Sequence, residues 1–199
     1  NKSRLEAFSD GVFAVIITIM VLEMKIPHGE SLADLKQVLP VFVCYILSFI
    51  YVGIYWSNHH HLFLLVERVN GKIIWANLFL LFWLSLFPFV TGWMGENHFG
   101  TWPSVLYGLV ALMNAVAWYV LSHIMIADYG KDSALARAYG KDNKGKVSAV
   151  LYVIGIILSF FLSWLGIIFY AIVAAMWIVP DKRIEKAIFN NNNQDFEIK

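Results

Sequence analysis

Long apolar blocks separated by short polar segments make up most of the chain. The first block begins a few residues after Arg4 and ends before Pro27, which cannot continue a helix. A transmembrane helix needs about 20 apolar residues, so the pattern predicts an all-α membrane protein with six transmembrane helices. We expect these spans at about residues 4–26, 38–66, 73–93, 104–129, 146–162 and 164–180.

The last apolar block, Val147 to Val179, is too long for one span. As a single helix it would measure about 50 Å, against roughly 30 Å for the hydrocarbon core. We therefore predict a break near Ser159–Ser163. One transmembrane domain then covers residues 1–189, and residues 190–199 form a polar tail. No small-residue cleavage site follows Leu22, so we expect the first helix to be retained.

Basic residues predict the orientation of the spans, because lysine and arginine concentrate on the cytoplasmic side. With six spans and the N-terminus inside, only Lys25 and Lys36 of the 15 lysines and arginines fall in outer segments. This asymmetry predicts a multi-pass protein of the cell membrane with both termini cytoplasmic. It also favours the break in the last block, since an unbroken helix would leave the C-terminal charges outside.

Composition excludes several classes of function. The chain of 199 residues is 59% hydrophobic and only 15% charged, and its net charge of +1 provides no basic patch for nucleic acid. Its single cysteine, Cys44, allows no internal disulfide. We find no nucleophile motif, no paired carboxylates within a span and no glycine-rich phosphate loop. The sequence therefore predicts neither an enzyme nor a bound cofactor.

Two polar clusters interrupt the apolar helices, where polar groups are costly. One contains Arg4, Glu6, Ser9 and Asp10 at the inner end of the first helix, and the other is the run Trp56 to His61 in the second. Because these helices run in opposite directions, the clusters fall at one depth, as does Asn77 on the third helix. We expect a network in which Asp10 and Arg4 pair with a histidine and Asn58. The alternative is that these groups are merely solvated near the helix ends.

The three consecutive histidines do not suit a metal or haem site. Neighbouring helical residues point about 100° apart, whereas metal ligands on a helix need a spacing of three or four residues. We therefore predict no metal. Asn114 and His123, on the fourth helix, are expected to form hydrogen bonds between helices.

The first helix resembles a known family. Its motif consists of Arg4, then Phe8-Ser9-Asp10-Gly11-Val12-Phe13-Ala14, then Thr18 and a final Leu22-Glu23. This motif is similar to the signature of the transmembrane-protein-175 potassium channels, and Trp56 with Asn58-His59-His60 is similar to that family's second helix. The resemblance and the polar clusters together give an expected structural network of Arg4, Phe8, Ser9, Asp10, Trp56, Asn58, His59, His60 and Asn77.

The resemblance implies a homotetramer in which the first helices line a pore for monovalent cations, with potassium preferred over sodium. Apolar side chains would form the constriction. The matching positions are Val15, Ile19 and Leu22 on one stripe, with Thr18 beside them. Val15 is small for this role, so the narrowest point would move to Ile19 or Leu22. Glu23 would lie at the outer mouth. The permeant ion is then potassium, and the bilayer and other copies of the chain are the partners.

Two other classes stay open from the residues alone. A secondary or proton-coupled transporter would use Asp10 and His60 as a proton relay. We see no clear inverted repeat or midplane helix break, which such transporters commonly have. A membrane redox protein would bind haem through the histidine run.

Overall fold

The computed structural model describes residues 1–139 and 142–178, which form α-helices and contain no strand. The helices are α1 (Lys2–Leu22), α2 (Leu32–Lys36), α3 (Leu39–Leu64), α4 (Gly71–Leu84), α5 (Phe87–Glu96), α6 (Thr101–Tyr129), α7 (Ala134–Tyr139), α8 (Asn143–Ser159) and α9 (Ser163–Ile178). The all-α prediction is therefore confirmed for these residues. The predicted polar tail and the end of the sixth predicted span, residues 179 and 180, lie outside them.

Within the described residues, four helical segments are long and apolar enough to cross a membrane: α1, α3, α4 with α5, and α6. They match the first four predicted spans in order. The third differs from the prediction, because Ser85 and Leu86 separate α4 from α5. Pro88 causes this break: it lacks an N–H group and therefore lies in the first turn of a new helix.

The last apolar block folds as two helices, α8 and α9, of 17 and 16 residues. The break lies where the sequence predicted it, between Ser159 and Ser163. Glycine makes the tight pairing of these helices feasible, since a Cβ atom on Gly166 would lie 2.6 Å from the carbonyl oxygen of Gly155. Any larger side chain at Gly166 would push the two helices apart.

Several helix ends differ from their predicted positions. Helix α1 ends at Leu22 rather than at residue 26, because Pro27 disfavours helical geometry in the residue before it. Helix α6 begins at Thr101 rather than at residue 104, since Pro103 is tolerated in a first turn. The predicted outer loop contains α2, whose N-terminus is capped by reciprocal hydrogen bonds between Ser31 and Asp34.

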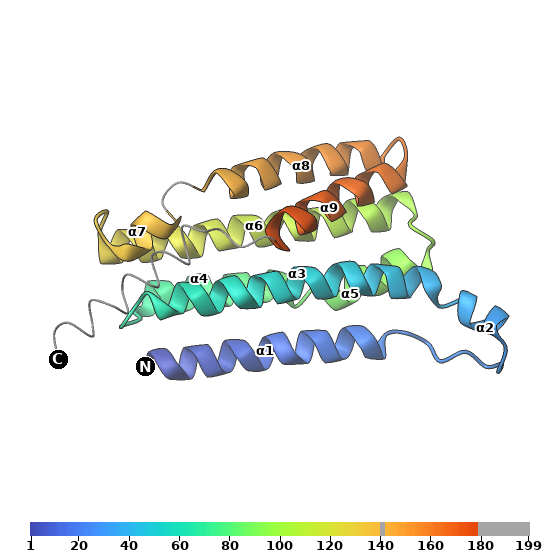
Figure 1. Cartoon of the computed structure of the whole chain (residues 1–199), viewed down its shortest axis with the longest axis horizontal. Helices are drawn as coiled ribbons and strands as arrows, with labels where there is room; N and C mark the ends of the chain where they lie inside the picture. The colour runs from blue at the N-terminus through green and yellow to red at the C-terminus, as the bar shows by residue number, and fades with distance from the viewer. Residues whose placement is uncertain (140–141, 179–199) are drawn as a thin grey trace.

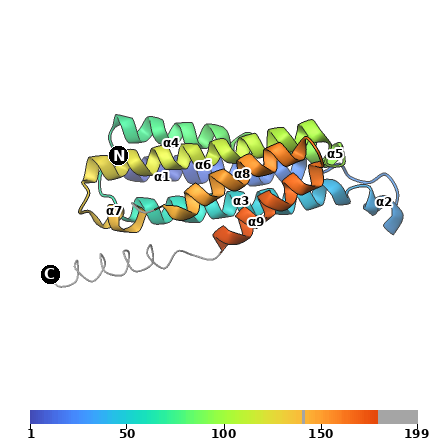
Figure 2. The same ribbon diagram turned by 90° about the horizontal axis from the view of Figure 1, so that it is seen from above.

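Helix α6 lies in the middle of the bundle and packs against α4, α5, α8 and α9. Helix α1 lies along one edge, where it packs against α3, α5 and α4 (Figures 1 and 2). No described element covers the side of α1 that faces away from α3 in Figure 1. The bundle therefore leaves one face of its first helix without a partner from the same chain.

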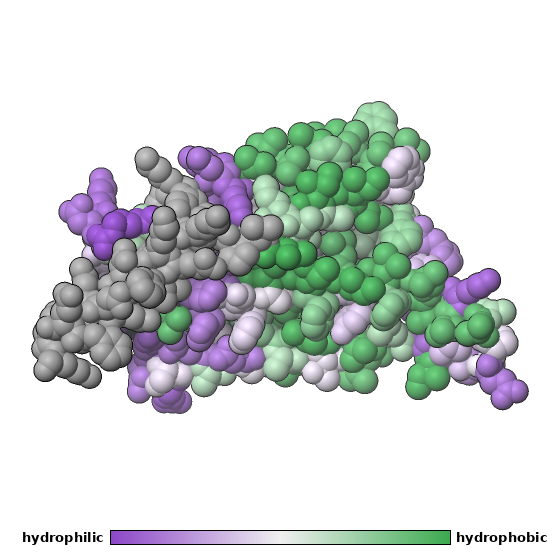
Figure 3. Space-filling model, in the orientation of Figure 1, coloured by the Kyte–Doolittle hydropathy of each residue, from purple (hydrophilic) through white to green (hydrophobic). Residues whose placement is uncertain are grey.

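Hydrophobic side chains cover the middle of the bundle surface over α8, α9 and α3, and hydrophilic side chains gather toward its two ends (Figure 3). Val150 and Ile157 of α8 and Ile172 of α9 are among the large apolar residues exposed on these helices. A soluble protein rarely exposes so large a continuous apolar surface. Such a band fits the hydrocarbon core of a bilayer.

Candidate functional site

The two faces of α1 have different environments. One face is buried against the rest of the bundle and consists of Leu5, Ser9, Phe13, Ile16 and Met20. The spacing of three or four residues places these side chains on one stripe. The opposite face contains the residues that the resemblance assigned to the pore, namely Val15, Thr18, Ile19 and Leu22, and all four are exposed.

The exposed apolar residues of α1 form a surface that needs another partner. Val15 is 55% exposed, Ile19 41% and Leu22 75%. The Thr18 hydroxyl donates a hydrogen bond of 2.8 Å to the carbonyl oxygen of Ala14, so its proton is used within the helix. The oxygen of Thr18 stays available as an acceptor toward the uncovered side.

The side chain of Glu23 points in a different direction from those of the exposed stripe. It caps the C-terminus of α1, and its Oε2 atom lies 3.6 Å from where a Cβ atom would stand on Gly92 of α5. Its carboxylate is therefore turned toward α5 and away from the stripe that ends at Leu22. Close by, Lys25 Nζ forms an ion pair of 2.8 Å with Glu96 Oε1, and this hydrogen bond raises the pKa of Lys25.

A buried hydrogen-bonded chain joins three helices near the end of the bundle where α1 begins, and we call it the amide network. Asn77 Nδ2 on α4 donates to Ser9 Oγ on α1 at 2.9 Å, and Ser9 Oγ donates to the carbonyl oxygen of Leu5 at 2.8 Å. His59 Nε2 on α3 lies 2.8 Å from Asn77 Oδ1, so with this amide orientation Nε2 carries the proton. Ser9, His59 and Asn77 are all buried.

Asp10 makes a separate contact at the surface. Trp56 Nε1 on α3 donates a hydrogen bond of 3.0 Å to Asp10 Oδ1, and both residues are exposed. His60 stacks on Trp56, with ring centroids 6.2 Å apart, and is itself exposed. The partner of Asp10 is thus the indole of Trp56, whereas a histidine was expected from the sequence.

The remaining predicted network residues lie outside the amide network. Arg4 is exposed and forms no ion pair with any described residue. Phe8 is exposed on the same side of α1 as Val15. Asn58 donates to the carbonyl oxygen of Ile54 within its own helix, at 3.0 Å. The expected pairing of Arg4 and Asp10 with Asn58 is therefore wrong, because these side chains point in different directions from their helices.

A second buried network was not predicted, and we call it the hydroxyl network. Ser48 Oγ on α3 lies 2.6 Å from Thr91 Oγ1 on α5 and 2.9 Å from Tyr107 Oη on α6. All three residues are buried. Serine and threonine in apolar helices commonly bond to their own backbone, so their sequence positions gave no signal of a contact between helices.

Among the described residues, neither Asn114 nor His123 of α6 forms the expected side-chain hydrogen bond to another helix. Asn114 Nδ2 donates to the carbonyl oxygen of Val110, and His123 Nδ1 lies 2.9 Å from the carbonyl oxygen of Tyr119. Both contacts stay within α6. The prediction for Asn114 and His123 was wrong because a helical residue can reach a carbonyl four positions earlier in its own helix.

The apolar surface, the membrane-length helices and the polar groups buried between helices define an integral membrane protein. The family described as "Endosomal/lysosomal potassium channel TMEM175" matches residues 4–88, which include α1, α3 and α4. The chain is 54% identical over 191 residues to a potassium channel of Chryseobacterium sp., covering 96% of this chain and all of that one. The chain belongs to the TMEM175 family.

More distant relatives agree with this assignment. A potassium channel of Streptomyces collinus is 32% identical over 151 residues, covering 69% of this chain and 73% of that one. The fold is similar to the crystal structure of a lysosomal potassium-selective channel TMEM175 homolog from Chamaesiphon minutus, with a TM-score of 0.78 at 26% identity. That match covers 89% of this chain and 96% of the other.

Proposed function

We propose that this protein is a potassium-permeable cation channel that conducts passively through a pore lined by α1. Relatives named as potassium channels support the ion and the class of protein. The observation that carries the pore assignment is the uncovered face of α1, where Val15, Ile19 and Leu22 are exposed although their own chain buries the opposite stripe.

In this proposal, four copies of the chain assemble so that the exposed faces of α1 meet around a central axis. Each chain has six spans, of which α8 and α9 are the last two, and both termini lie in the cytoplasm of a cell whose plasma membrane holds the channel. Closure of an apolar ring covers the exposed stripe, which accounts for large side chains on a face that its own chain leaves open.

The apolar stripe would form a narrow neck at Ile19 and Leu22. Such a neck gates by dewetting, because an ion in an apolar passage without water loses its solvation. Potassium is dehydrated at lower cost than sodium, which gives a preference between the two ions. The acceptor oxygen of Thr18 would replace part of the lost water.

The remaining polar residues would act at a distance from the ion. The amide network would hold α1 against α3 and α4, and thereby set the position of the stripe. The contact between Asp10 and Trp56 would hold the same helix from its exposed side. Because Glu23 is turned toward α5, it would attract cations to the outer mouth by its charge without standing in the neck.

The deciding experiment measures downhill potassium and sodium flux into liposomes containing the purified protein. We expect fast flux with potassium preferred, and we expect Ile19→Ala and Leu22→Ala to weaken that preference by widening the neck. Ile157→Ala is the matched control, since it removes the same atoms from an exposed site on α8. Unchanged selectivity in both neck variants would refute the apolar constriction.

The same flux assay in liposomes tests the alternative function, that of a transporter. A secondary or proton-coupled carrier that uses Asp10 and the histidine run would give slow, saturable flux coupled to protons. In the described residues Asp10 bonds to Trp56 and His59 bonds to Asn77, so no direct hydrogen bond joins the two ionisable groups. Native mass spectrometry of the wild type and of Asp10→Ala tests the tetramer and the contribution of this contact to assembly.

A further inference from the structure

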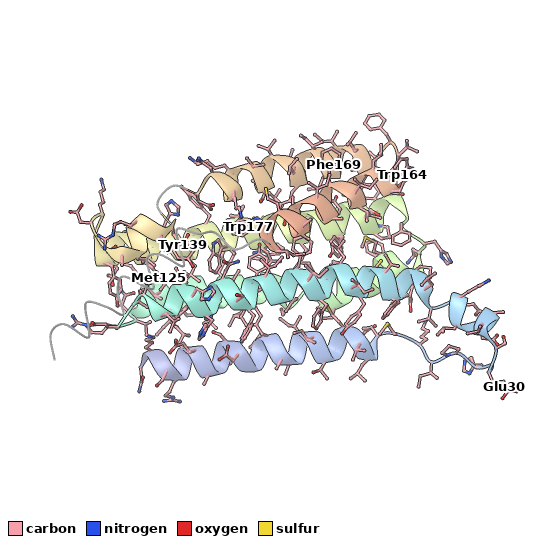
Figure 4. All side chains as sticks on the ribbon, viewed as in Figure 1. Glu30, Met125, Tyr139, Trp164, Phe169 and Trp177 are labelled. Atoms are coloured by element: carbon pink, nitrogen blue, oxygen red, sulfur yellow. The ribbon has the colours of Figure 1, made fainter. Side chains whose placement is uncertain are left out.

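A cavity of about 180 Å³ lies between α3, α6 and α8, and no residue of α1 lines it. Helix α8 packs mainly against α6 and α9 and not closely against α3, so the cavity occupies the space that this arrangement leaves. Figure 4 shows Trp177, which lines the cavity, at the end of α9 nearest α7. The cavity is thus a gap in the packing of the second half of the bundle, separate from the proposed pore face.

Aromatic rings form much of the cavity wall. They belong to Tyr51 and Tyr55 of α3, Trp118 and Tyr119 of α6, Tyr152 of α8 and Trp177 of α9. The ring centroids of Tyr51 and Tyr152 lie 6.2 Å apart with the rings tilted by 44°. The ring of Tyr55 meets that of Trp118 edge to face, also at 6.2 Å. Aromatic rings prefer such tilted and edge-to-face neighbours, so the wall offers favourable contacts to a further ring.

The wall makes little demand for hydrogen bonds from a ligand. Trp177 Nε1, for example, already donates to Ser148 Oγ at 2.8 Å. Among the described residues, the buried side-chain atoms without a hydrogen-bond partner are Trp83 Nε1 and Asn114 Oδ1, and neither residue lines the cavity. A buried water molecule needs two to four polar partners, so the cavity favours an apolar molecule over water.

The charged residues of the wall offset each other. Asp142 and Lys146 both line the cavity near the start of α8. The carboxylate of Asp142 also accepts the Gly145 N–H at 2.7 Å and thereby caps α8. Opposite charges at one place give no preference to an anion or a cation, and a charge taken out of water without a partner is costly. The cavity therefore favours a neutral ligand.

We propose that this cavity binds a small neutral aromatic molecule dissolved in the apolar part of the bilayer. A dry apolar cavity of about 150 Å³ binds benzene, so a cavity of about 180 Å³ holds a slightly larger ring compound. Val116 and Tyr119 line the cavity and are exposed, which gives such a molecule access from the bundle surface. A lipid acyl chain fits less well, because it makes no ring–ring contacts and loses more rotational freedom than a rigid ring.

Thermal unfolding of the purified full chain in detergent, with added toluene or methylcyclohexane, tests the preference for an aromatic ring. A ligand that binds the folded state raises the melting temperature by mass action, and its concentration dependence gives the affinity. We expect toluene to bind roughly two- to tenfold more tightly than its saturated analogue, the usual effect of contacts between rings. The charged analogues benzoate and benzylammonium should give no such shift.

Matched variants separate binding in the cavity from an effect of toluene on the micelle. Ala115→Leu fills part of the cavity from α6 and should abolish the shift of the melting temperature with toluene. Ala149→Leu fills it from α8 and makes the same test if Ala115→Leu does not fold. Ala175→Leu adds the same atoms at an exposed site on α9 outside the cavity and should keep the shift.

Three outcomes would overturn the proposal. Equal toluene shifts in the filled variants and in Ala175→Leu would place the effect outside the cavity. Equal affinities for toluene and methylcyclohexane, or equal stabilisation by benzoate or benzylammonium, would show that the site does not select a neutral ring. A cavity-dependent shift that is larger with decane than with toluene would assign the cavity to an acyl chain.

Discussion

The amide network and the hydroxyl network bury polar groups between helices in different ways. The amide network joins α1, α3 and α4 through Ser9, His59 and Asn77. The hydroxyl network joins α3, α5 and α6 through Ser48, Thr91 and Tyr107. Amide and imidazole groups have fixed donor and acceptor directions, whereas a hydroxyl group rotates and can find another partner. The first network should therefore tolerate the loss of a member less well than the second.

Their positions suggest different roles. The amide network is one of the contacts that hold α1, the helix whose opposite face is exposed, so its loss should affect both stability and the position of the proposed pore face. The hydroxyl network joins helices that α5 already holds together, since α5 packs against both α3 and α6. Its loss should affect stability alone.

The largest effect is expected from Asn77→Leu. Leucine has a similar size but no polar atoms, so Ser9 and His59 both lose a buried partner. We expect the free energy of unfolding to fall by about 2 kcal/mol, near the upper range for hydrogen bonds between transmembrane helices. Equilibrium unfolding in mixed micelles, monitored by circular dichroism, measures this change.

Asn58→Leu provides the matched control for Asn77→Leu. Among the described residues, the side chain of Asn58 bonds only to the carbonyl oxygen of Ile54 in its own helix, so its replacement should lower the free energy of unfolding by well under half as much. Adding His59→Phe to Asn77→Leu should cost less than the sum of the two single changes, because the residues share one hydrogen bond. Strict additivity would show that the amide network does not act as a unit.

A smaller effect is expected from Ser48→Ala. Ser48 is the shared partner of Thr91 and Tyr107, but the Thr91 hydroxyl can turn to a carbonyl of its own helix. We expect a loss of about 1 kcal/mol in the same unfolding measurement, with potassium flux unchanged. Ser57→Ala, on the same helix and without a hydrogen bond to a described residue, is the control. A loss that matched or exceeded that of Asn77→Leu would reverse the proposed ranking.

Much of the fold could be predicted from the sequence, because proline positions and the lengths of the apolar blocks limit where helices stop. The break between α8 and α9 followed from the length of the last apolar block and from the distribution of basic residues. The split between α4 and α5 did not, because Pro88 is compatible both with a kinked helix and with a new one. Helix α2 was missed although the pair Ser31 and Asp34 is a capping signal, since five residues are too few for a periodic pattern.

The sequence predicted the level along the bundle at which the candidate-site residues lie, but not which of their side chains bond to one another. Antiparallel helices placed Ser9, His59 and Asn77 at one level, and the structure joins these three. Which residue faces which neighbour depends on the rotation of each helix, and that is fixed by packing along its whole length. Side chains of adjacent residues therefore point in different directions, so that Ser9 is buried in the bundle and Asp10 is exposed at its surface. The pore stripe came from the family resemblance, because α1 is apolar on nearly every side.

The smallest effect is expected from the exposed ion pair between Lys25 and Glu96, at the end of the bundle where α1 ends. Glu96 raises the pKa of Lys25 above its ordinary value of 10.5, so the pair stabilises the fold below that pH and is lost as pH rises through the folded-state value. Lys25→Met should lower the melting temperature slightly at neutral pH and low salt. The difference from wild type should vanish in high salt, which screens exposed charges, and again once the pH has risen past the folded-state pKa of Lys25. A loss comparable to that of Ser48→Ala, or one insensitive to salt, would show that this end of α1 depends on charge as much as the interior depends on buried hydrogen bonds.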